Sequence, residues 1–231
     1  MSPPGSLVIA RAAAFGQLVG LVLPAHDEPA ALDSLDAELH DEERALAAGL
    51  ALPRRVTFVG GRVALRRALR AVGCAEAPIA STPRGAPALP SGYAGSIAHK
   101  PAIAVALAAA ASADVTLGID VEPERAPRVD ISGRVLTPAE RARVAALGSE
   151  AARTRELLVA FAAKEAIYKA LDPWLGRYVS FQEVEIARAA DGGLGAMFAR
   201  RAGEPAFAIE LLEETLAGHV LVTARVRRHE P

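Results

Sequence analysis

The stretch from Thr154 to Leu171 constrains the fold more than any other part of the chain, because its pattern predicts one long amphipathic helix. Its residues are good helix formers, and Asp172-Pro173 is expected to stop the helix because proline cannot continue one. The apolar side chains recur at three- and four-residue steps and so share one face: Leu158, Phe161, Ala162 and Tyr168.

Glu165 falls on this same apolar face of the predicted helix. A carboxylate there is costly unless a cation, a base or a metal ion meets it. The simpler interpretation is an ordinary ion pair between Glu165 and Lys169 on a solvated flank of the helix. The helix alone favours this ion pair. Whether Glu165 is instead a functional carboxylate depends on the other motifs of the chain.

A strand is predicted from Asp114 to Glu122, where apolar and polar residues alternate. Asp120 and Glu122 therefore project from the same face of this strand. Two carboxylates held so close repel each other unless a cation lies between them, and Mg²⁺ suits such a pair because it binds carboxylates and phosphates together. Gly118 is expected to leave room for a ligand beside the backbone. The alternative is a polar strand face in water.

A basic segment precedes this strand. From Gly61 the sequence predicts a helix start, with Arg62, Arg66 and Arg70 on one face. Several guanidinium groups beside a helix N-terminus suit a ligand with phosphate groups. The alternative is a solvated basic face that pairs with the acidic helix predicted from Leu35 to Leu50.

Two more basic groups lie in or near loops. A proline-rich loop is predicted from Ala77 to Gly92 and holds Arg84. Strands follow at Tyr93–His99 and Ile103–Leu107, which places His99 at the end of a hairpin. A single histidine in a loop is more often a solvent-exposed side chain without a functional role than a ligand-binding residue.

Composition narrows the possible partners and location. The chain has 231 residues, is 52% hydrophobic and carries a formal net charge of -1, so neither nucleic acid nor an anionic membrane is expected as a partner. Cys74 is the only cysteine, which excludes an intrachain disulfide and fits a reducing cytoplasm. The apolar run from Ala12 to Ala25 is too short to span a bilayer as a helix. A cytoplasmic protein is therefore expected.

The remaining chain supplies further predicted strands and one helix. A capping box at Thr137-Pro138-Ala139-Glu140 starts a helix to about Leu147. Strands are predicted at Leu7–Ile9, Gln17–Leu23, Val179–Ile186, Met197–Ala199, Ala206–Leu211 and His219–Val226. Both halves of the chain run from helices into strands, which permits a weak internal duplication.

Two of these motifs occur together in one order: Gly118-Ile119-Asp120-Val121-Glu122, then Phe161-Ala162-Ala163-Lys164-Glu165-Ala166-Ile167-Tyr168-Lys169. In this order and spacing they resemble the paired signature of the 4'-phosphopantetheinyl transferases, and the upstream Gly95-Ser96-Ile97-Ala98-His99 also matches. The arginine-rich stretch from Arg55 to Leu69 and the Pro87…Pro90…Gly92 loop resemble the enterobactin-synthetase branch of the surfactin-type group. The resemblance runs from about residue 35 to residue 186.

The resemblance implies an α+β fold of two similar α/β halves with pseudo-twofold symmetry and a site in the cleft between them. Residues 1–115 would contact the 3'-phosphate and adenine of coenzyme A, and residues 116–231 would hold the metal and pyrophosphate. The implied reaction moves the phosphopantetheine arm of coenzyme A to a serine of an acyl or peptidyl carrier protein and releases adenosine 3',5'-bisphosphate. The branch favours secondary metabolism or siderophore synthesis, and a single chain with two halves makes a monomer the default.

Roles for individual residues follow from the same resemblance. Asp120, Glu122 and Glu165 would hold Mg²⁺ on the pyrophosphate, while Lys169 and Lys164 would meet phosphate oxygens. His99 and Arg84 would bind the 3'-phosphate, with assistance from Arg62. Asp120, Glu165 and Lys169 form the predicted catalytic set, and either Glu165 or a metal-bound water is the base for the carrier serine.

One departure and two alternatives remain. The family usually has a serine before this histidine, whereas this chain has Ala98, so one hydrogen bond to coenzyme A would be absent. The same carboxylates and basic groups also permit a magnesium-dependent nucleotide phosphohydrolase. The other alternative is a non-catalytic protein that binds coenzyme A.

Overall fold

The computed structural model describes residues 5–25, 29–75 and 78–229. The chain divides into two compact units, Met1–Ser112 and Ala113–Pro231, here called the N-terminal and C-terminal units. Each unit sets helices against antiparallel strands, and the predicted α+β class is confirmed. The boundary predicted after residue 115 falls just inside the first strand of the C-terminal unit, β5 (Val115–Pro123).

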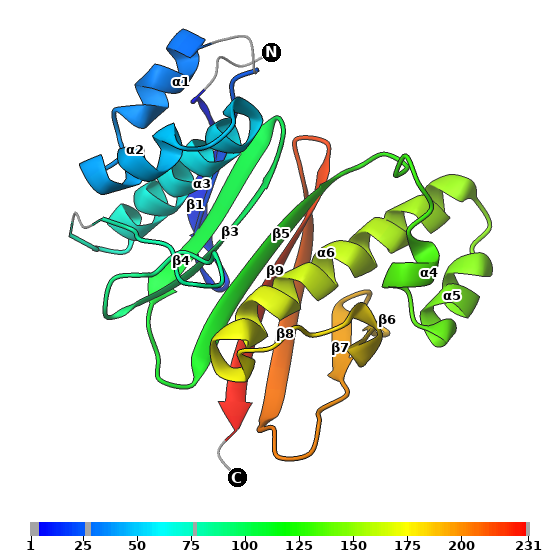
Figure 1. The fold of residues 1–231 in the computed structure, drawn as a ribbon. Coiled ribbons are helices and arrows are strands. Elements are labelled where there is room, and N and C mark those ends of the chain that lie inside the picture. The colour runs from blue at the N-terminus through cyan, green and yellow to red at the C-terminus, as the bar shows by residue number, and fades with distance from the viewer. Residues whose placement is uncertain (1–4, 26–28, 76–77, 230–231) are drawn as a thin grey trace. The chain divides into compact units, whose positions relative to one another are not determined.

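In its described residues, the N-terminal unit is a four-stranded antiparallel sheet covered by helices (Figure 1). The strand order is β1-β2-β4-β3, and the strands are β1 (Leu7–Ala13), β2 (Gly16–Val22), β3 (Tyr93–Lys100) and β4 (Ile103–Ala110). The helices are α1 (Pro29–Asp36), α2 (Asp41–Ala48) and α3 (Leu52–Ala71). Helix α3 contacts β2, β3 and β4, so it is the main cover of this sheet.

Helix α3 packs on the sheet through small residues. Val59 and Val63 of the helix are fully buried in one core with Ala104 and Ala106 of β4. A Cβ atom at Gly60 would lie 2.0 Å from Cδ2 of Leu23, so glycine lets the helix approach closely. The prediction of a helix start at Gly61 is therefore wrong, because tertiary contact holds the glycine pair inside the helix.

The helix predicted from Leu35 to Leu50 is also wrong, because the chain forms α1 and α2 with a break between them. His40 is the N-cap of α2, and its backbone N–H donates to Glu43 Oε2 at 3.2 Å. This capping box starts a new helix where the sequence pattern continued without interruption.

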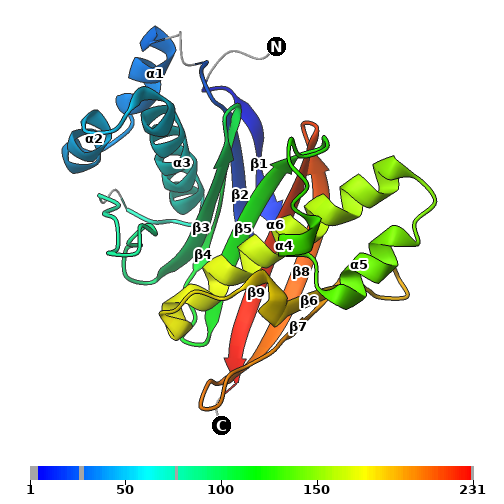
Figure 2. The same ribbon diagram turned by 45° about the vertical axis from the view of Figure 1, so that its right-hand side comes forward.

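The C-terminal unit contains a three-stranded antiparallel sheet in the order β5-β9-β8 and a separate β6-β7 hairpin. Its strands after β5 are β6 (Val184–Arg188), β7 (Leu194–Phe198), β8 (Ala206–Leu216) and β9 (His219–His229). Its helices are α4 (Ser132–Val135), α5 (Pro138–Ala145), α6 (Glu150–Leu175) and the 3-10 helix η1 (Phe181–Glu183). Figure 2 shows α6 crossing this sheet, in agreement with its contacts to β5 and β9.

Helix α6 is longer than predicted. Ser149 caps its start by accepting a hydrogen bond from the Ala152 N–H at 3.1 Å. Pro173 lies inside the last turn, and the helix ends at Leu175, followed by Gly176 as the C-cap with a left-handed φ of 56°. A proline so near the end removes little helical hydrogen bonding, and the glycine supplies the actual stop.

The strand predicted at Val179–Ile186 is partly wrong, because its middle forms η1 before β6 begins. In the part of the chain that the structure describes, no helix has both the length and the apolar character needed to cross a membrane.

Candidate functional site

The polar face of β5 packs against α6. Thr116 Oγ1 donates to the Ala170 carbonyl at 2.6 Å, and a Cβ atom at Gly118 would lie 1.9 Å from the Ala166 carbonyl oxygen. The expectation that Gly118 leaves room for a ligand is therefore wrong. The space beside its backbone is filled by α6, so the glycine sets how closely helix and strand approach.

The same contact brings Lys169 to Asp120. The Lys169 ammonium donates to Asp120 Oδ1 at 2.7 Å and to the Ile119 carbonyl at 2.9 Å. Asp120 is only 6% exposed, and its other oxygen, Oδ2, is buried with no hydrogen-bond partner among the described residues. One oxygen of this carboxylate is thus held by a cation, and the other still has both lone pairs to offer.

The other two predicted metal ligands also belong to the C-terminal unit. Glu122 is buried on β5, and Glu165 is half-buried on α6. Within residues 5–25, 29–75 and 78–229, no three His, Cys, Asp or Glu side chains form a group that could hold a metal ion. The set of three carboxylates therefore stays a prediction.

Lys164 lies in the interior, where its side chain has no solvent exposure. Its ammonium donates to the Val135 carbonyl at 2.8 Å, the Phe181 carbonyl at 3.0 Å and Glu140 Oε2 at 2.6 Å. Burial lowers the pKa of Lys164 from its ordinary value, and the hydrogen bond to Glu140 opposes that shift. Because all three N–H donors are used within the C-terminal unit, the geometry argues against the predicted phosphate contact of Lys164.

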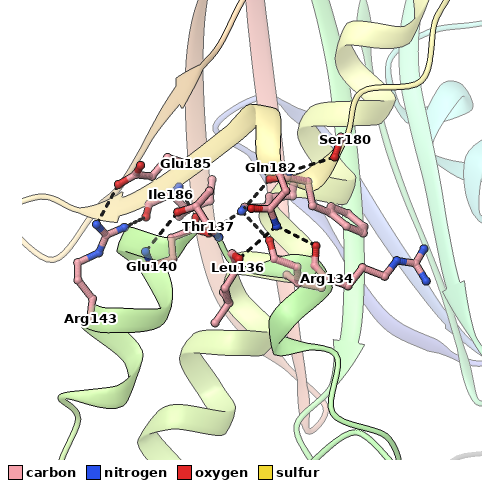
Figure 3. A network of polar contacts seen from close by, with 12 residues as sticks. Arg134, Leu136, Thr137, Glu140, Arg143, Ser180, Gln182, Glu185 and Ile186 are labelled. Atoms are coloured by element: carbon pink, nitrogen blue, oxygen red, sulfur yellow. Dashed lines mark hydrogen bonds and ion pairs between the residues drawn. The ribbon is translucent and has the colours of Figure 1, made fainter.

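Glu140, the partner of Lys164, lies in a larger polar network (Figure 3). Glu140 Oε2 accepts from the Thr137 N–H at 2.7 Å, which is the capping box predicted from the sequence, and Oε1 accepts from the Ile186 N–H at 2.6 Å. Arg143 binds Glu185 at 2.9 Å and the Ile186 carbonyl at 2.7 Å. Helix α5 is thereby tied to β6, and α4 is tied to η1 because Gln182 Nε2 donates to the Arg134 carbonyl at 3.0 Å.

In the N-terminal unit, two of the three arginines predicted to share one face of α3, Arg62 and Arg66, are buried. Arg62 donates from Nη2 to Ser81 Oγ at 2.8 Å and lies over the Phe58 ring, while its Nη1 has no hydrogen-bond partner in the described structure. Burial lowers the pKa of Arg62 from its ordinary value. Arg66 forms a buried ion pair with Glu43. The alternative is thus half right: Arg66 pairs with Glu43 and Arg70 with Glu38 of the acidic segment, but the face is not solvated throughout, since only Arg70, 45% exposed, reaches the surface among these three arginines.

His99 lies half-buried near the end of β3, where its Nε2 is 3.0 Å from Nη1 of Arg54. Arg54 was not among the residues singled out from the sequence. Its place in the first turn of α3 became visible only once the true start of that helix was known. Arg84 is exposed in the loop, of which residues 78–92 are described, and Ala98 is buried beside His99.

Two family models match the chain, one in each unit. The model of the 4'-phosphopantetheinyl transferase superfamily matches residues 116–224. The model of the 4'-phosphopantetheinyl transferase N-terminal domain matches residues 42–109. Together they cover the strand β5, the helix α6 and the arginine-rich helix α3.

Named relatives agree with this match. The chain is 31% identical over 224 residues to the 4'-phosphopantetheinyl transferase PptT of Mycobacterium tuberculosis, which covers 92% of each chain. It is 34% identical over 170 residues to the 4'-phosphopantetheinyl transferase Svp of Streptomyces mobaraensis, covering 73% of this chain and 66% of that protein. A solved ACPS–CoA complex of Chronobacterium ammoniagenes is 19% identical with a TM-score of 0.42, covering 50% of this chain and 98% of the other.

The chain belongs to the 4'-phosphopantetheinyl transferase superfamily. The prediction that it is a transferase of this class is confirmed. The predicted activity, transfer of the phosphopantetheine group of coenzyme A to a carrier protein, is confirmed as the activity of the family.

Proposed function

We propose that this chain moves the phosphopantetheine arm of coenzyme A to a serine of an acyl or peptidyl carrier protein, at a site built around Asp120. The observation that carries the proposal is the state of that carboxylate. Asp120 is buried and fixed by Lys169 through Oδ1, yet its Oδ2 has no hydrogen-bond partner among the described residues. A buried charged oxygen without a partner is costly, so a ligand that meets it gains that free energy.

The donor chemistry of this region fits Mg²⁺. Asp120 and Glu122 lie two residues apart on β5, and Glu165 lies on α6, which packs on that strand. All three offer carboxylate oxygens, the ligand type that a hard divalent cation prefers. We propose that these three residues hold the ion. When bound, it would neutralise the pyrophosphate and stabilise the bisphosphate leaving group.

Basic residues of the N-terminal unit are proposed to bind the 3'-phosphate of coenzyme A. Arg54 donates from Nη1 to Nε2 of His99 at 3.0 Å, which holds the two side chains together, and the other guanidinium N–H groups of Arg54 are the proposed donors to the phosphate. The buried Arg62 has one nitrogen without a hydrogen-bond partner in the described structure, and Arg84 adds an exposed positive charge in the loop. Of these four residues, Arg54 is added from the structure.

The transfer reaction does not need a covalent bond between the protein and the substrate. Transfer needs the carrier hydroxyl, the phosphorus atom and the leaving oxygen to lie roughly in line. The serine hydroxyl must lose a proton, and Glu165 is the proposed acceptor because it is a half-buried carboxylate in the same region. The rest of the rate enhancement would come from positioning and from positive charge near the phosphates.

The direct test is the intact mass of an apo carrier protein after incubation with the chain, coenzyme A and Mg²⁺. A gain equal to one phosphopantetheine arm, prevented by EDTA, is expected. Hydrolysis of coenzyme A without modification of the carrier would favour a phosphohydrolase instead. Binding of coenzyme A without any reaction, over a panel of carriers, would favour a non-catalytic protein.

A pair of variants tests the metal site. Asp120→Asn should reduce transfer to near background, while Asp114→Asn should retain it. Asp114 directly precedes the same strand and pairs with Arg228 at 3.0 Å. Its substitution therefore also removes one carboxylate charge and is the matched control. Full activity in D120N, with circular dichroism of both variants unchanged, would remove the metal hypothesis. Mn²⁺ in place of Mg²⁺ is a second arm of the same assay.

We also propose, from the sequence, that the protein acts as a cytoplasmic monomer on carriers of secondary metabolism or siderophore synthesis. Its low net charge and single cysteine support the compartment. Size-exclusion chromatography with light scattering checks the monomer, and competition between carrier classes in the mass assay checks the pathway.

A further inference from the structure

We propose that Glu43 of α2 is the internal counter-ion of Arg62, and that its charge limits how strongly the protein prefers coenzyme A over 3'-dephospho-coenzyme A. The inference rests on the proposed function, because it takes Arg62 as one of the positive charges that act on the 3'-phosphate. Glu43 is buried, so it determines this specificity through its charge and not through a contact with the ligand.

Glu43 lies in the interior of the N-terminal unit, next to two arginines of α3. Its side chain is 1% exposed and forms an ion pair with Arg66, whose side chain is 3% exposed. Arg62 lies one turn earlier on the same helix and is also buried. Burial is the main cause that lowers the pKa of Arg62, and the negative charge of Glu43 raises it. The carboxylate therefore acts on both guanidinium groups.

The hydrogen bonds of Glu43 use only one of its two oxygens. Oε2 accepts from the His40 N–H at 3.2 Å and binds Arg66, while Oε1 has no hydrogen-bond partner in the described structure. Arg62 donates from Nη2 to Ser81 at 2.8 Å, and its Nη1 has no partner among the described residues. Glu43 and Arg62 thus interact as charges through the protein interior, where electrostatic interactions are stronger than in water.

This group of three side chains, Arg62, Arg66 and Glu43, carries two positive charges and one negative charge. Glu43 lowers the cost of burying the two arginines when no ligand is bound. The same carboxylate repels a phosphate and reduces the positive potential that Arg62 offers to it. Glu43 therefore stabilises the fold and weakens phosphate binding, whereas a residue with a structural role alone would not weaken binding.

The variant Glu43→Gln removes the charge and keeps an oxygen that can accept from the His40 N–H. Calorimetry gives the Kd of coenzyme A and of 3'-dephospho-coenzyme A, and the ratio of the two measures the preference for the 3'-phosphate. We expect this preference to rise about threefold or more in E43Q, because the buried positive charge is no longer balanced. Tm without ligand should fall because Arg66 loses its partner. An unchanged or lower preference would overturn the proposal.

Two control variants separate charge from packing and from position. Glu43→Asp shortens the side chain but keeps its charge, so Tm should fall while the preference stays at the wild-type value. Glu38→Gln removes the charge of another acidic partner of α3, which pairs with Arg67 and is 26% exposed. Its preference should stay within about twofold of wild type, because solvent screens this pair. A rise in either control as large as in E43Q would overturn the proposal.

A double variant keeps the test decisive if E43Q does not fold. In R66M, Arg62 has Glu43 as the remaining charge of the group, and in R66M/E43Q it has neither neighbour. The double variant contains no half of the buried ion pair, so no buried charge is left unpaired by the substitutions. We expect a preference about threefold or more higher in R66M/E43Q than in R66M. Equal preferences would overturn the proposal.

Wild-type protein separates failure of this inference from failure of the proposed function. If it binds both forms of coenzyme A equally well, the proposed 3'-phosphate site fails, and this inference fails with it. If it prefers coenzyme A and E43Q does not increase that preference, only the role of Glu43 is overturned. If it modifies no carrier protein, the proposed transfer fails, whereas the binding comparison still decides the role of Glu43.

Discussion

Helix α3 of the N-terminal unit and helix α6 of the C-terminal unit each lie on an antiparallel sheet, but glycine serves them differently. In the first unit the glycine is on the helix, where Gly60 faces the end of a leucine side chain. In the second unit it is on the strand, where Gly118 faces the Ala166 carbonyl. The leucine side chain can change its rotamer, whereas the backbone of a helix cannot move out of the way by itself. The contact at Gly118 therefore tolerates an added Cβ atom less well than the contact at Gly60.

Buried charge also differs between the units. Arg66 and Glu43 form a buried pair, in which Glu43 Oε1 has no hydrogen-bond partner in the described structure. In the Lys164–Glu140 pair, all three lysine donors and both carboxylate oxygens are bonded. A fully bonded pair fixes several segments at once, which suits the unit that carries the proposed metal site.

The largest expected effect is on stability when the fully bonded pair is broken. Lys164→Met leaves Glu140 charged and buried, and we expect it to lower the free energy of unfolding by about 3–5 kcal/mol. Arg66→Met should cost less, because that pair binds fewer segments together. Urea unfolding of both variants measures the difference. An equal loss in both would contradict the comparison.

The glycine contacts come next. Gly118→Ala should cost about 3 kcal/mol, because the added Cβ meets backbone of α6 at 1.9 Å and the helix must shift. Gly60→Ala should cost about 1 kcal/mol, since Leu23 can change its rotamer. Tm and the free energy of unfolding of the two variants measure which substitution costs more. A larger loss of stability for Gly60→Ala would contradict the comparison of the two helices.

Removing both charges of each pair sharpens the comparison. We expect R66M/E43Q to approach wild-type stability, because few groups are left unsatisfied. K164M/E140Q should stay about 2 kcal/mol less stable, since the Val135 and Phe181 carbonyls lose their donor. Urea unfolding measures the stability of both double variants. If both recover wild-type stability to the same extent, the proposed difference between the two buried ion pairs is contradicted.

The smallest expected effect concerns two threonines. Thr116→Val removes the 2.6 Å hydrogen bond from β5 to α6 and should cost about 1 kcal/mol. Thr57→Val removes only bonds of 3.1 and 3.4 Å within α3 and should cost a few tenths of a kcal/mol. Thermal unfolding compares them, with the isosteric valine keeping the packing volume. A T57V loss equal to that of T116V would be unexpected.

Local patterns in the sequence predicted much of this molecule. The alternation in β5 placed Asp120 and Glu122 on one face, and the capping box at Thr137 started α5 as observed. Both features depend on residues a few positions apart, so the sequence contains the relevant physics. The motifs around Asp120 and Glu165 also identified the family, which the comparisons confirm.

Other features depended on distant partners and were mispredicted. A helix was predicted to start at Gly61, but this glycine lies inside α3, because the sheet needs a helix with little side-chain bulk there. Gly118 resembled an opening for a ligand but is filled by α6. The phosphate contact of Lys164 stays a prediction, and the burial of this lysine against Glu140 argues against it. In each case the deciding contact comes from another segment.

The sequence by itself determined the family and the α+β class, because the motifs and patterns that point to them depend on short-range spacing. Only the tertiary structure decided which of two neighbouring lysines faces the interior and which holds Asp120. Lys164 and Lys169 are alike in charge and local helix context. Their roles separate because α4, α5 and η1 surround one of them, while β5 binds the other.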